Sequence, residues 1–417
     1  MSKPNVVFIM SDDHALDAVG CYATRLKHLV HTPNIDQLAK DGARFKQAAV
    51  ENAICSPGRA GCYSGQYTHG HGVFMLGKAI NNASQTWPKL LDDAGYDTCV
   101  VGKWHLENEP PSIFPGYSAV VHAHNQGMWF NPKFRVKTRD GTATEFQHPE
   151  GYASDAYTDY ALNWLETLRD KSKPFALSLN FKAPHSTYEY PDRYLDYHSD
   201  VRDFGPPASL HDGNRGCGAT ACDSGSRITN KLYDHLYMST YYNEYLRKDK
   251  RTPPVPSSGD DNKVQQSYDH YMLKMLRCVR AMDDNVGRVV RYLKENSLDE
   301  NTLIVYTSDQ GYFLGEFGLA GKRTILDPTM RIPLIMKFPG RIKPGMEPDC
   351  LTQNVDIAPT IMDFMGVSKS PSFHGESMQP LLESGVTWDR QVQFFGYYQS
   401  VPPHHGIRTR EFTFARV

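Results

Sequence analysis

The residues that could do chemistry begin with Cys55, which stands in the run Cys55-Ser56-Pro57-Gly58-Arg59. Ser56 is of a type that caps helices and Pro57 is of a type that fills the first helical position, so a helix is predicted to start beside Cys55. A helix N-terminus attracts anions through its free N–H groups and its dipole. A lone cysteine at such a place is usually a buried thiol, but the C-x-P-x-R pattern favours a nucleophile that acts on an anion.

Several acidic residues offer a place for a metal ion. Asp12, Asp13 and Asp309 supply three carboxylates, and Gln310 adds a side-chain amide oxygen. An all-oxygen set of this kind suits a hard divalent cation. Carboxylates that share one crevice without a cation repel each other and raise one another's pKa values. Asp12-Asp13 alone could be a helix cap, but together with Asp309 it predicts a metal site. The sequence has no Cys or His cluster at metal spacing, which argues against zinc.

These residues follow short apolar runs that are typical of buried strands. The runs are 5–10 before Ser11 to His14, 97–101 before Gly102 to His105, 175–181 before Lys182 to His185, and 302–307 before Ser308 to Gly311. Helical patterns lie between them, so strands and helices alternate, which predicts an α/β fold with a mainly parallel sheet. Ligands of such sheets bind beyond the carboxyl ends of the strands. We therefore expect segments that are distant in sequence to converge on one crevice.

Helices are expected at 156–168 and 272–293, where apolar residues recur at helical spacing, and from Thr32-Pro33 to Gly42. Alternating runs at 391–398 and 407–414 predict a small antiparallel annex. We expect a large catalytic domain at 1–371 and a small or incomplete C-terminal subdomain at 372–417. The segment 186–263 is rich in Pro, Gly, Tyr and Asp, and it is predicted to form a long excursion over the active face.

The run from Cys55 to Arg59 resembles the signature of the type I sulfatases, members of the alkaline phosphatase superfamily whose signature cysteine is oxidised to formylglycine. Further motifs occur in the order typical of that family: Asp12-Asp13, Gly102-Lys-Trp-His105, Ala183-Pro-His185, and the run from Ser308 to Lys322. One short motif can arise by chance, but several in the family's order rarely do. The resemblance implies an alkaline phosphatase-like fold, in which helices flank a large mainly parallel or mixed sheet.

The activity that the resemblance implies is hydrolysis of a sulfate ester with release of inorganic sulfate. One hydroxyl of a hydrated aldehyde formed from Cys55 attacks sulfur. Deprotonation of the second hydroxyl then expels sulfate, so a covalent intermediate divides one hard step into two. A cysteine thiol would not serve, because its sulfated form would need a separate water for hydrolysis.

The resemblance also assigns roles to five basic residues. Arg59 supports the nucleophile, and Lys103 and Lys322 hold the sulfate oxygens, because negative charge develops there in the transition state. His105 contacts the hydroxyl of the nucleophile and helps its deprotonation. His185 protonates the leaving alcohol, since imidazole titrates near neutral pH.

Calcium is the usual ion of the family, one per chain. Its implied ligands here are Asp12, Asp13, Asp309, Gln310 and the modified Cys55. The maturation enzyme that forms formylglycine is an expected partner. Two positions depart from the family pattern. Gln310 stands where relatives often have Asn or His, so an oxygen ligand is kept but the side chain has a different reach. Glu316-Phe317 replaces a frequent Glu-His, and this substitution leaves a secondary substrate contact in doubt.

For the substrate, the family offers aryl sulfates, choline sulfate and sulfated sugars, and we favour a sulfated oligosaccharide or polysaccharide. Aromatic residues in the variable segments could stack on a sugar or serve as ordinary packing: Trp129, Tyr188, Tyr190, Tyr194 and Tyr197. One alternative is a phosphodiester or phosphonate monoester hydrolase of the same superfamily. Another is a catalytically silent binder of sulfated glycans in which Cys55 stays a thiol.

Some histidines lack the support of a strand end, and we expect them at the surface or the substrate rim: His69, His71, His122, His124, His404 and His405. Most of the cysteines are expected to be buried thiols. Cys217 and Cys222 lie in a Gly/Ser-rich run and could pair in an oxidising compartment.

The composition sets outer limits on these interpretations. With 417 residues and 40% hydrophobic content, the chain can bury a large core. The 45 Lys and Arg nearly balance the 47 Asp and Glu, so the bulk charge points to neither nucleic acid nor membrane. No apolar stretch approaches the roughly 20 residues that span a bilayer. Strand-like sequence starts at Asn5 and leaves no room for a secretory leader. We expect a periplasmic or secreted enzyme whose leader is absent from this chain, with a cytoplasmic location as the alternative.

Overall fold

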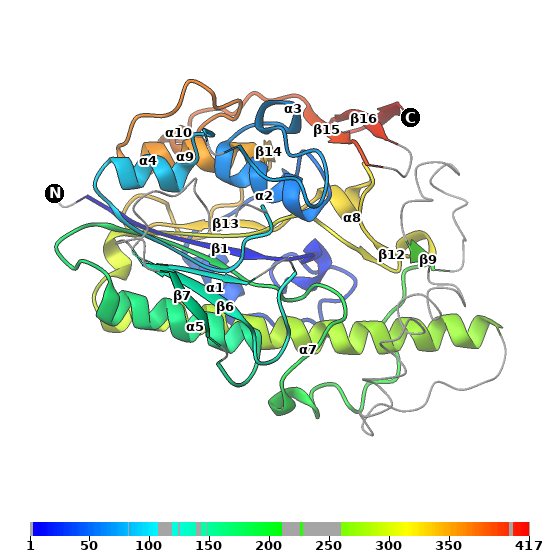
Figure 1. Cartoon of the computed structure of the whole chain (residues 1–417). Coiled ribbons are helices and arrows are strands. Elements are labelled where there is room, and N and C mark those ends of the chain that lie inside the picture. Colours follow the sequence, from blue (N-terminus) through cyan, green and yellow to red (C-terminus); the bar gives the residue numbers. More distant parts are fainter. Residues whose placement is uncertain are drawn as a thin grey trace.

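The computed structural model describes residues 3–81, 83–106, 119–123, 126–138, 143–147, 149–210, 226–227, 260–399 and 403–416. A nine-stranded sheet forms the centre (Figure 1). Its strands lie in the order β2 (Ala43–Arg44), β13 (Leu334–Lys337), β10 (Thr302–Ser308), β1 (Asn5–Ser11), β8 (Phe175–Asn180), β4 (Asp97–Lys103), β5 (Ala119–Ala123), β6 (Phe134–Thr138) and β7 (Ala143–Gln147). The central strands from β10 to β5 are parallel, and the outer pairs are antiparallel. The predicted α/β fold is confirmed.

Strand β1 shows why both faces of the sheet need helices. Its side chains alternate between two cores: Val6, Phe8 and Met10 belong to one, and Val7 and Ile9 to the other. The helices of the first face are α2 (Cys55–Ser64), α4 (Trp87–Asp93), α9 (Ile357–Met365) and α10 (Gln379–Ser384), and those of the second are α1 (Pro33–Asp41), α5 (Ala153–Asn163) and α7 (Asp260–Glu295). Figure 1 shows the two groups on opposite sides of the sheet. The helices predicted after Thr32, at 156–168 and at 272–293 are therefore present.

Helix α2 begins earlier than its capping pattern indicated. Ile54 is the N-cap, and the Gly58 N–H donates a 3.0 Å hydrogen bond to the Ile54 carbonyl. The helix start beside Cys55 is confirmed, but the prediction that Ser56 is the cap and Pro57 the first helical residue is wrong. The Ser56 hydroxyl is buried without a hydrogen-bond partner among the described residues. Pro57 fits as the third helical residue because N–H groups of the first turn have no intrahelical partner.

The C-terminal segment forms the predicted antiparallel annex. Strands β15 (Gln393–Tyr397), β16 (His404–Arg408) and β17 (Thr413–Arg416) pair antiparallel in sequence order. Phe395 and Tyr397 of β15 pack into the same core as α9. The boundary between 371 and 372 remains a prediction.

The predicted excursion at 186–263 is described in part. Phe204 and Leu210 pack against α7 in a third core, and β9 (Ser226–Arg227) pairs with β12 (Leu319–Gly321), which pairs with β11 (Phe313–Leu314). Cys217 and Cys222 lie outside the described residues. None of the helices in the described ranges combines the length and the apolar character that a bilayer crossing requires.

Candidate active site

The register of β1 and β10 brings the predicted carboxylates together. Ser11 lies opposite Ser308, and both strands end there, so Asp12 and Asp309 follow side by side. The Asp13 N–H donates a 3.1 Å hydrogen bond to Asp309 Oδ1. Two segments almost 300 residues apart in sequence are thus joined at one strand edge.

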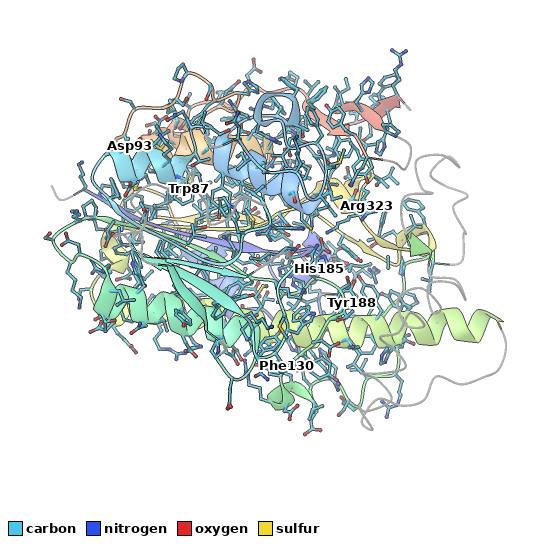
Figure 2. All side chains as sticks on the ribbon, viewed as in Figure 1. Trp87, Asp93, Phe130, His185, Tyr188 and Arg323 are labelled. Atoms are coloured by element: carbon cyan, nitrogen blue, oxygen red, sulfur yellow. The ribbon has the colours of Figure 1, made fainter. Side chains whose placement is uncertain are left out.

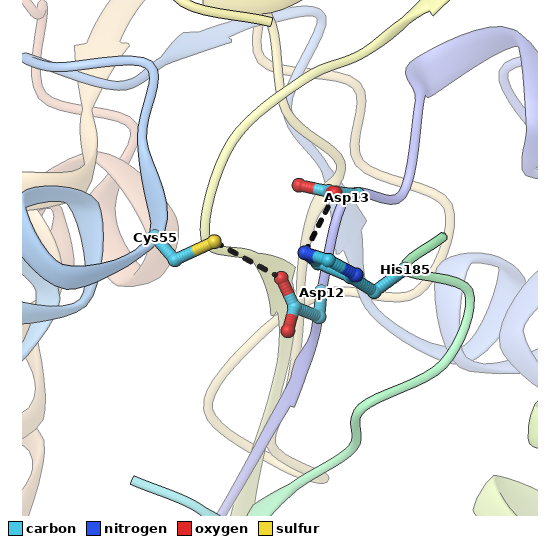
Figure 3. A group of neighbouring side chains, drawn as sticks. All are labelled: Asp12, Asp13, Cys55 and His185. Atoms are coloured by element: carbon cyan, nitrogen blue, oxygen red, sulfur yellow. Dashed lines mark hydrogen bonds and ion pairs between the residues drawn. The ribbon is translucent and has the colours of Figure 1, made fainter. Parts of the chain in front are cut away.

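The Cys55 thiol lies opposite Asp12 and Asp13, at the first residue of α2 (Figure 3). It is completely buried. Its Sγ is 2.8 Å from the Lys322 ammonium, 3.5 Å from Asp12 Oδ1 and 3.8 Å from the Lys103 ammonium. Residue 55 therefore has cations and a carboxylate in contact with it on the side away from its helix.

Arg59 connects the elements around Cys55. It lies one turn further along α2 and is fully buried. Its Nε donates a 2.9 Å hydrogen bond to Asp309 Oδ2, and its Nη1 donates a 2.8 Å hydrogen bond to the Lys103 carbonyl. Its Nη2 lies 3.5 Å from Asp12 Oδ2. The guanidinium thereby holds the ends of β1, β4 and β10 against α2.

Two lysines complete the cationic side of the crevice. Lys103 ends β4, and its ammonium forms an ion pair with Asp12 and donates a 2.5 Å hydrogen bond to Gln126 Oε1. Lys322 follows β12, and its ammonium lies 2.5 Å from Asp13 Oδ1. Both lysines are buried. The ammonium groups are positioned to contact an anion at residue 55.

The charges of the crevice shift the pKa values of its acids. Burial and the Asp12 carboxylate raise the pKa of Asp309 well above its ordinary value. Burial also disfavours the Asp12 carboxylate, but Lys103 and the other nearby cations outweigh it and lower the pKa of Asp12. Burial and Asp12 raise the pKa of the Cys55 thiol, yet Lys103 and Lys322 overcome them and bring it down to about 7.

The two histidines of the site have different surroundings. Burial, followed by the charges of Lys103 and Arg59, lowers the pKa of His105 to about 3, so its ring is neutral at neutral pH. His185 lies at the strand ends between the helices of the two faces (Figure 2), and its side chain is 15% exposed. Its Nδ1 is 2.6 Å from the Ser186 carbonyl, which only accepts, so Nδ1 carries a proton and Nε2 faces the crevice, 3.5 Å from Asp13 Oδ2.

Several buried polar atoms of the crevice lack a hydrogen-bond partner among the described residues: Gln310 Oε1, His105 Nδ1 and Arg59 Nη2. Ligand atoms of Asp12, Asp13, Cys55 and His185 lie within 4.8 Å of one another. The Gln310 amide faces Asp13 with its nitrogen, and a half-turn of the amide would present the oxygen instead. Unsatisfied buried atoms beside crowded carboxylates fit a site for a cation and an anionic ligand.

Comparison with known proteins decides the family. A family model described as Sulfatase matches residues 4–367. The chain belongs to the sulfatase family. An N-acetylglucosamine-6-O-sulfatase of Bacteroides thetaiotaomicron is 36% identical over 98% of this chain and 78% of that protein. A human N-acetylglucosamine-6-sulfatase is 28% identical over 94% of this chain and 66% of its own length.

Solved structures agree with this assignment. A protein in complex with its substrate D-glucosamine-2-N,6-O-disulfate is 32% identical, with a TM-score of 0.84 over 99% of this chain and 90% of that one. A phosphonate monoester hydrolase from Silicibacter pomeroyi has a TM-score of 0.71 at 21% identity, over 99% of this chain and 87% of that one, which shows the shared fold alone. The predicted enzyme class, a sulfuric ester hydrolase, is confirmed for this sulfatase.

Other predicted residues of the sulfatase lie elsewhere. His71 and His404 are buried, so their placement at the surface is wrong; His71 contacts Glu51 Oε1 at 3.2 Å, and the His404 ring lies against Phe395. His69 and His405 are exposed as predicted, whereas the side chains of His122 and His124 lie outside the description. Glu316 is half-buried; it accepts a 2.6 Å hydrogen bond from the Leu314 N–H and pairs with Arg25 at 3.4 Å.

The aromatic residues considered for sugar stacking are engaged in packing. Trp129 and Tyr188 are buried, and Trp129 stacks on Tyr152. The other three are half-buried and hydrogen-bonded: Tyr190 to Arg277, Tyr194 to Asp284, and Tyr197 to His31.

Two contributors to the crevice had no assigned role in the sequence analysis. Gln126 contacts the Lys103 ammonium but lies in no motif, so no pattern pointed to it. Lys182 had a usable signal, because it opens the polar cluster that contains His185. Its ammonium donates a 2.9 Å hydrogen bond to the Gln126 carbonyl.

The unmodified, calcium-free sulfatase should have an acidic thiol at Cys55. Titration of its thiolate absorbance, with Cys55→Ser as the blank, should give a midpoint near pH 7, above which the thiolate predominates. Lys322→Met should move the midpoint upward, because the ammonium 2.8 Å from Sγ stabilises the thiolate. An unchanged midpoint in that variant would contradict the electrostatic account.

Proposed function

We propose that this sulfatase removes sulfate from a carbohydrate, with Cys55 converted to formylglycine and one calcium ion beside it. The observation that carries the proposal is the convergence of Arg59, Lys103 and Lys322 on the buried residue 55, at a helix N-terminus. The carbohydrate follows from the relatives, since one is named for N-acetylglucosamine 6-sulfate and another holds a glucosamine disulfate as its substrate. The glycan is thus proposed by similarity, whereas the anion site is argued from the geometry.

The cations of the crevice bind the sulfate group. Lys103 and Lys322 reach residue 55 from different strands, so their ammonium groups can contact different sulfate oxygens. Arg59 is held by Asp309 and the Lys103 carbonyl, so it stays in place as charge develops. Charges fixed in a buried site stabilise a transition state more than mobile charges in water do. Formylglycine would supply the oxygen that attacks sulfur.

The oxygen atoms at the strand ends would hold calcium. Asp12, Asp13 and Asp309 supply carboxylates, Gln310 supplies its amide oxygen, and the modified residue 55 would complete the set. When bound, calcium would supply the positive charge that neutralises these carboxylates. Lys103 and Lys322 pair with Asp12 and Asp13 in this structure, and both ammonium groups would be available to the substrate once the carboxylates are neutralised.

The two histidines would move protons at opposite ends of the reaction. His105 is neutral and its Nδ1 has no hydrogen-bond partner among the described residues, so it can accept a hydrogen bond from the nucleophile. His185 is partly exposed, and with both ring nitrogens protonated its Nε2–H faces the crevice. That arrangement suits a donor to the leaving alcohol.

A desulfation screen tests the function. The chain is produced together with a formylglycine-generating enzyme and assayed on sulfated oligosaccharides, an aryl sulfate, a phosphodiester and a phosphonate. Release of sulfate from a sugar should dominate, and Cys55→Ala should reduce it by more than about 10³-fold, because the nucleophile is lost. A mass shift at the Cys55 peptide checks the modification. Higher turnover of the phosphonate would instead favour a phosphonate hydrolase.

Calcium binding can be measured without turnover. Titration calorimetry on the unmodified chain should find one calcium site, and Asp309→Asn should weaken it by about 10–100-fold, because it removes a ligand charge. Asp159→Asn is the matched control, since Asp159 is exposed and pairs with Arg288 at the surface. Metal analysis that finds zinc in the active enzyme would count against the proposal.

His185→Ala separates proton donation from sulfate binding. A sugar alkoxide leaves poorly without a proton, whereas nitrophenolate leaves almost unaided. The variant should therefore lose about 10²–10⁴-fold in kcat on a carbohydrate sulfate and far less on nitrophenyl sulfate. Equal losses on both substrates would show that His185 holds the sulfate or supports the fold.

A further inference from the structure

A third buried ammonium, that of Lys182, shares a contact residue with Lys103. Lys182 lies two residues after the end of β8 and is 5% exposed. Its ammonium donates a hydrogen bond to the Gln126 carbonyl and lies 5.2 Å from the centre of the Trp129 ring. Among the described residues, no carboxylate forms an ion pair with it. A buried cation whose protein partners are neutral has lost its hydration without gaining an opposite charge.

Gln126 joins this ammonium to the reaction centre. Its main-chain oxygen accepts from Lys182, and its side-chain oxygen accepts a 2.5 Å hydrogen bond from Lys103. The Lys103 ammonium in turn lies 3.8 Å from Cys55 Sγ. Burial, and then the charge of Lys103, lowers the pKa of Lys182 to about 8, so the ammonium is mostly protonated at neutral pH. The two lysines thus lie on either side of one glutamine beside residue 55.

The charge balance of the crevice favours a substrate with more than one negative charge. Three buried carboxylates (Asp12, Asp13 and Asp309) pair with three buried cations (Arg59, Lys103 and Lys322), and Lys182 adds a fourth buried cation beside them. The proposed calcium would add two positive charges. A sulfate monoester carries one negative charge, so a singly sulfated sugar would leave the crevice strongly positive. A second anionic group would be attracted to the cation that has no acidic partner among the described residues.

We propose that Lys182 binds a second anionic substituent on the sugar whose sulfate ester is cleaved. This rests on the proposed function, because it takes the sulfate to be bound at residue 55. Lys182 would then determine specificity for doubly anionic sugars, and Gln126 would hold its ammonium at a set distance from Lys103.

The test uses calorimetry on the calcium-loaded Cys55→Ala chain, so that binding is measured without turnover. The two probes are N-acetylglucosamine 6-sulfate, with a neutral group at position 2, and glucosamine-2-N,6-O-disulfate, with an anionic group there. The disulfate should bind more tightly. Adding Lys182→Met should weaken binding of the disulfate by about 10–100-fold, which is the range for losing a hydrogen bond between charged groups. The affinity for the monosulfate should stay nearly unchanged. Lys182→Arg should keep the preference.

The other outcomes overturn the proposal. If Lys182→Met weakens the binding of both probes equally, Lys182 only positions Lys103 through Gln126. If the substitution changes neither affinity, Lys182 is a packing residue. The same conclusion follows if the Cys55→Ala chain binds the disulfate no more tightly than the monosulfate. Lys274→Met is the matched control, because Lys274 is also buried but pairs with Glu189 at 3.4 Å, and it should leave both affinities unchanged. Thermal unfolding checks each variant, and Lys182→Gln replaces the Met variant if that one does not fold. Because this test measures binding and not turnover, it is independent of the activity assay. An enzyme without substitutions that releases no sulfate would contradict the proposed function, but it would not decide the role of Lys182.

Discussion

Compensation of charge among buried side chains is the constraint on which the site depends. Asp12 and Asp309 are fully buried, and each needs a positive partner. Arg59 serves both, at 2.9 Å from Asp309 and 3.5 Å from Asp12. Removing one partner of a buried ion pair typically costs about 3–5 kcal/mol, because the other charge is left unpaired. The residues that would bind sulfate and calcium therefore also hold the strand ends together.

Close approach of the main chain makes this pairing possible. A Cβ on Gly58 would lie 2.2 Å from the Asp309 carbonyl, so only glycine lets α2 pack directly against the end of β10. Gly102 has φ of 101°, and a Cβ there would lie 2.1 Å from the Asn180 carbonyl. These two glycines set how near residue 55 and Lys103 come to the carboxylates. The glycine in the C-x-P-x-R run is thus a packing requirement beside the nucleophile.

The two histidines of the site lie in different environments. His105 is buried among cations, which keeps its ring neutral, whereas His185 is partly exposed and faces Asp13. Two groups of one chemical type can serve as acceptor and donor when their surroundings differ in this way. The same contrast distinguishes Lys103, which pairs with Asp12, from Lys182, which has a neutral partner in Gln126.

The sequence by itself determined the fold class and most residues of the crevice, but not Gln126 or Lys182. Short apolar runs in the sequence indicate buried strands, and a polar cluster after such a run has no packing role. Asp12, Lys103, His185 and Asp309 could therefore be placed at strand ends. The start of α2 was predicted two residues too late, because side-chain caps are only one way in which a helix begins. Only the tertiary structure decided which groups pair: that Arg59 binds Asp309, that Gln126 lies between two lysines, and that Lys182 has a neutral partner. Pairing depends on the register of strands and on contacts between segments far apart in sequence, and no local pattern records either.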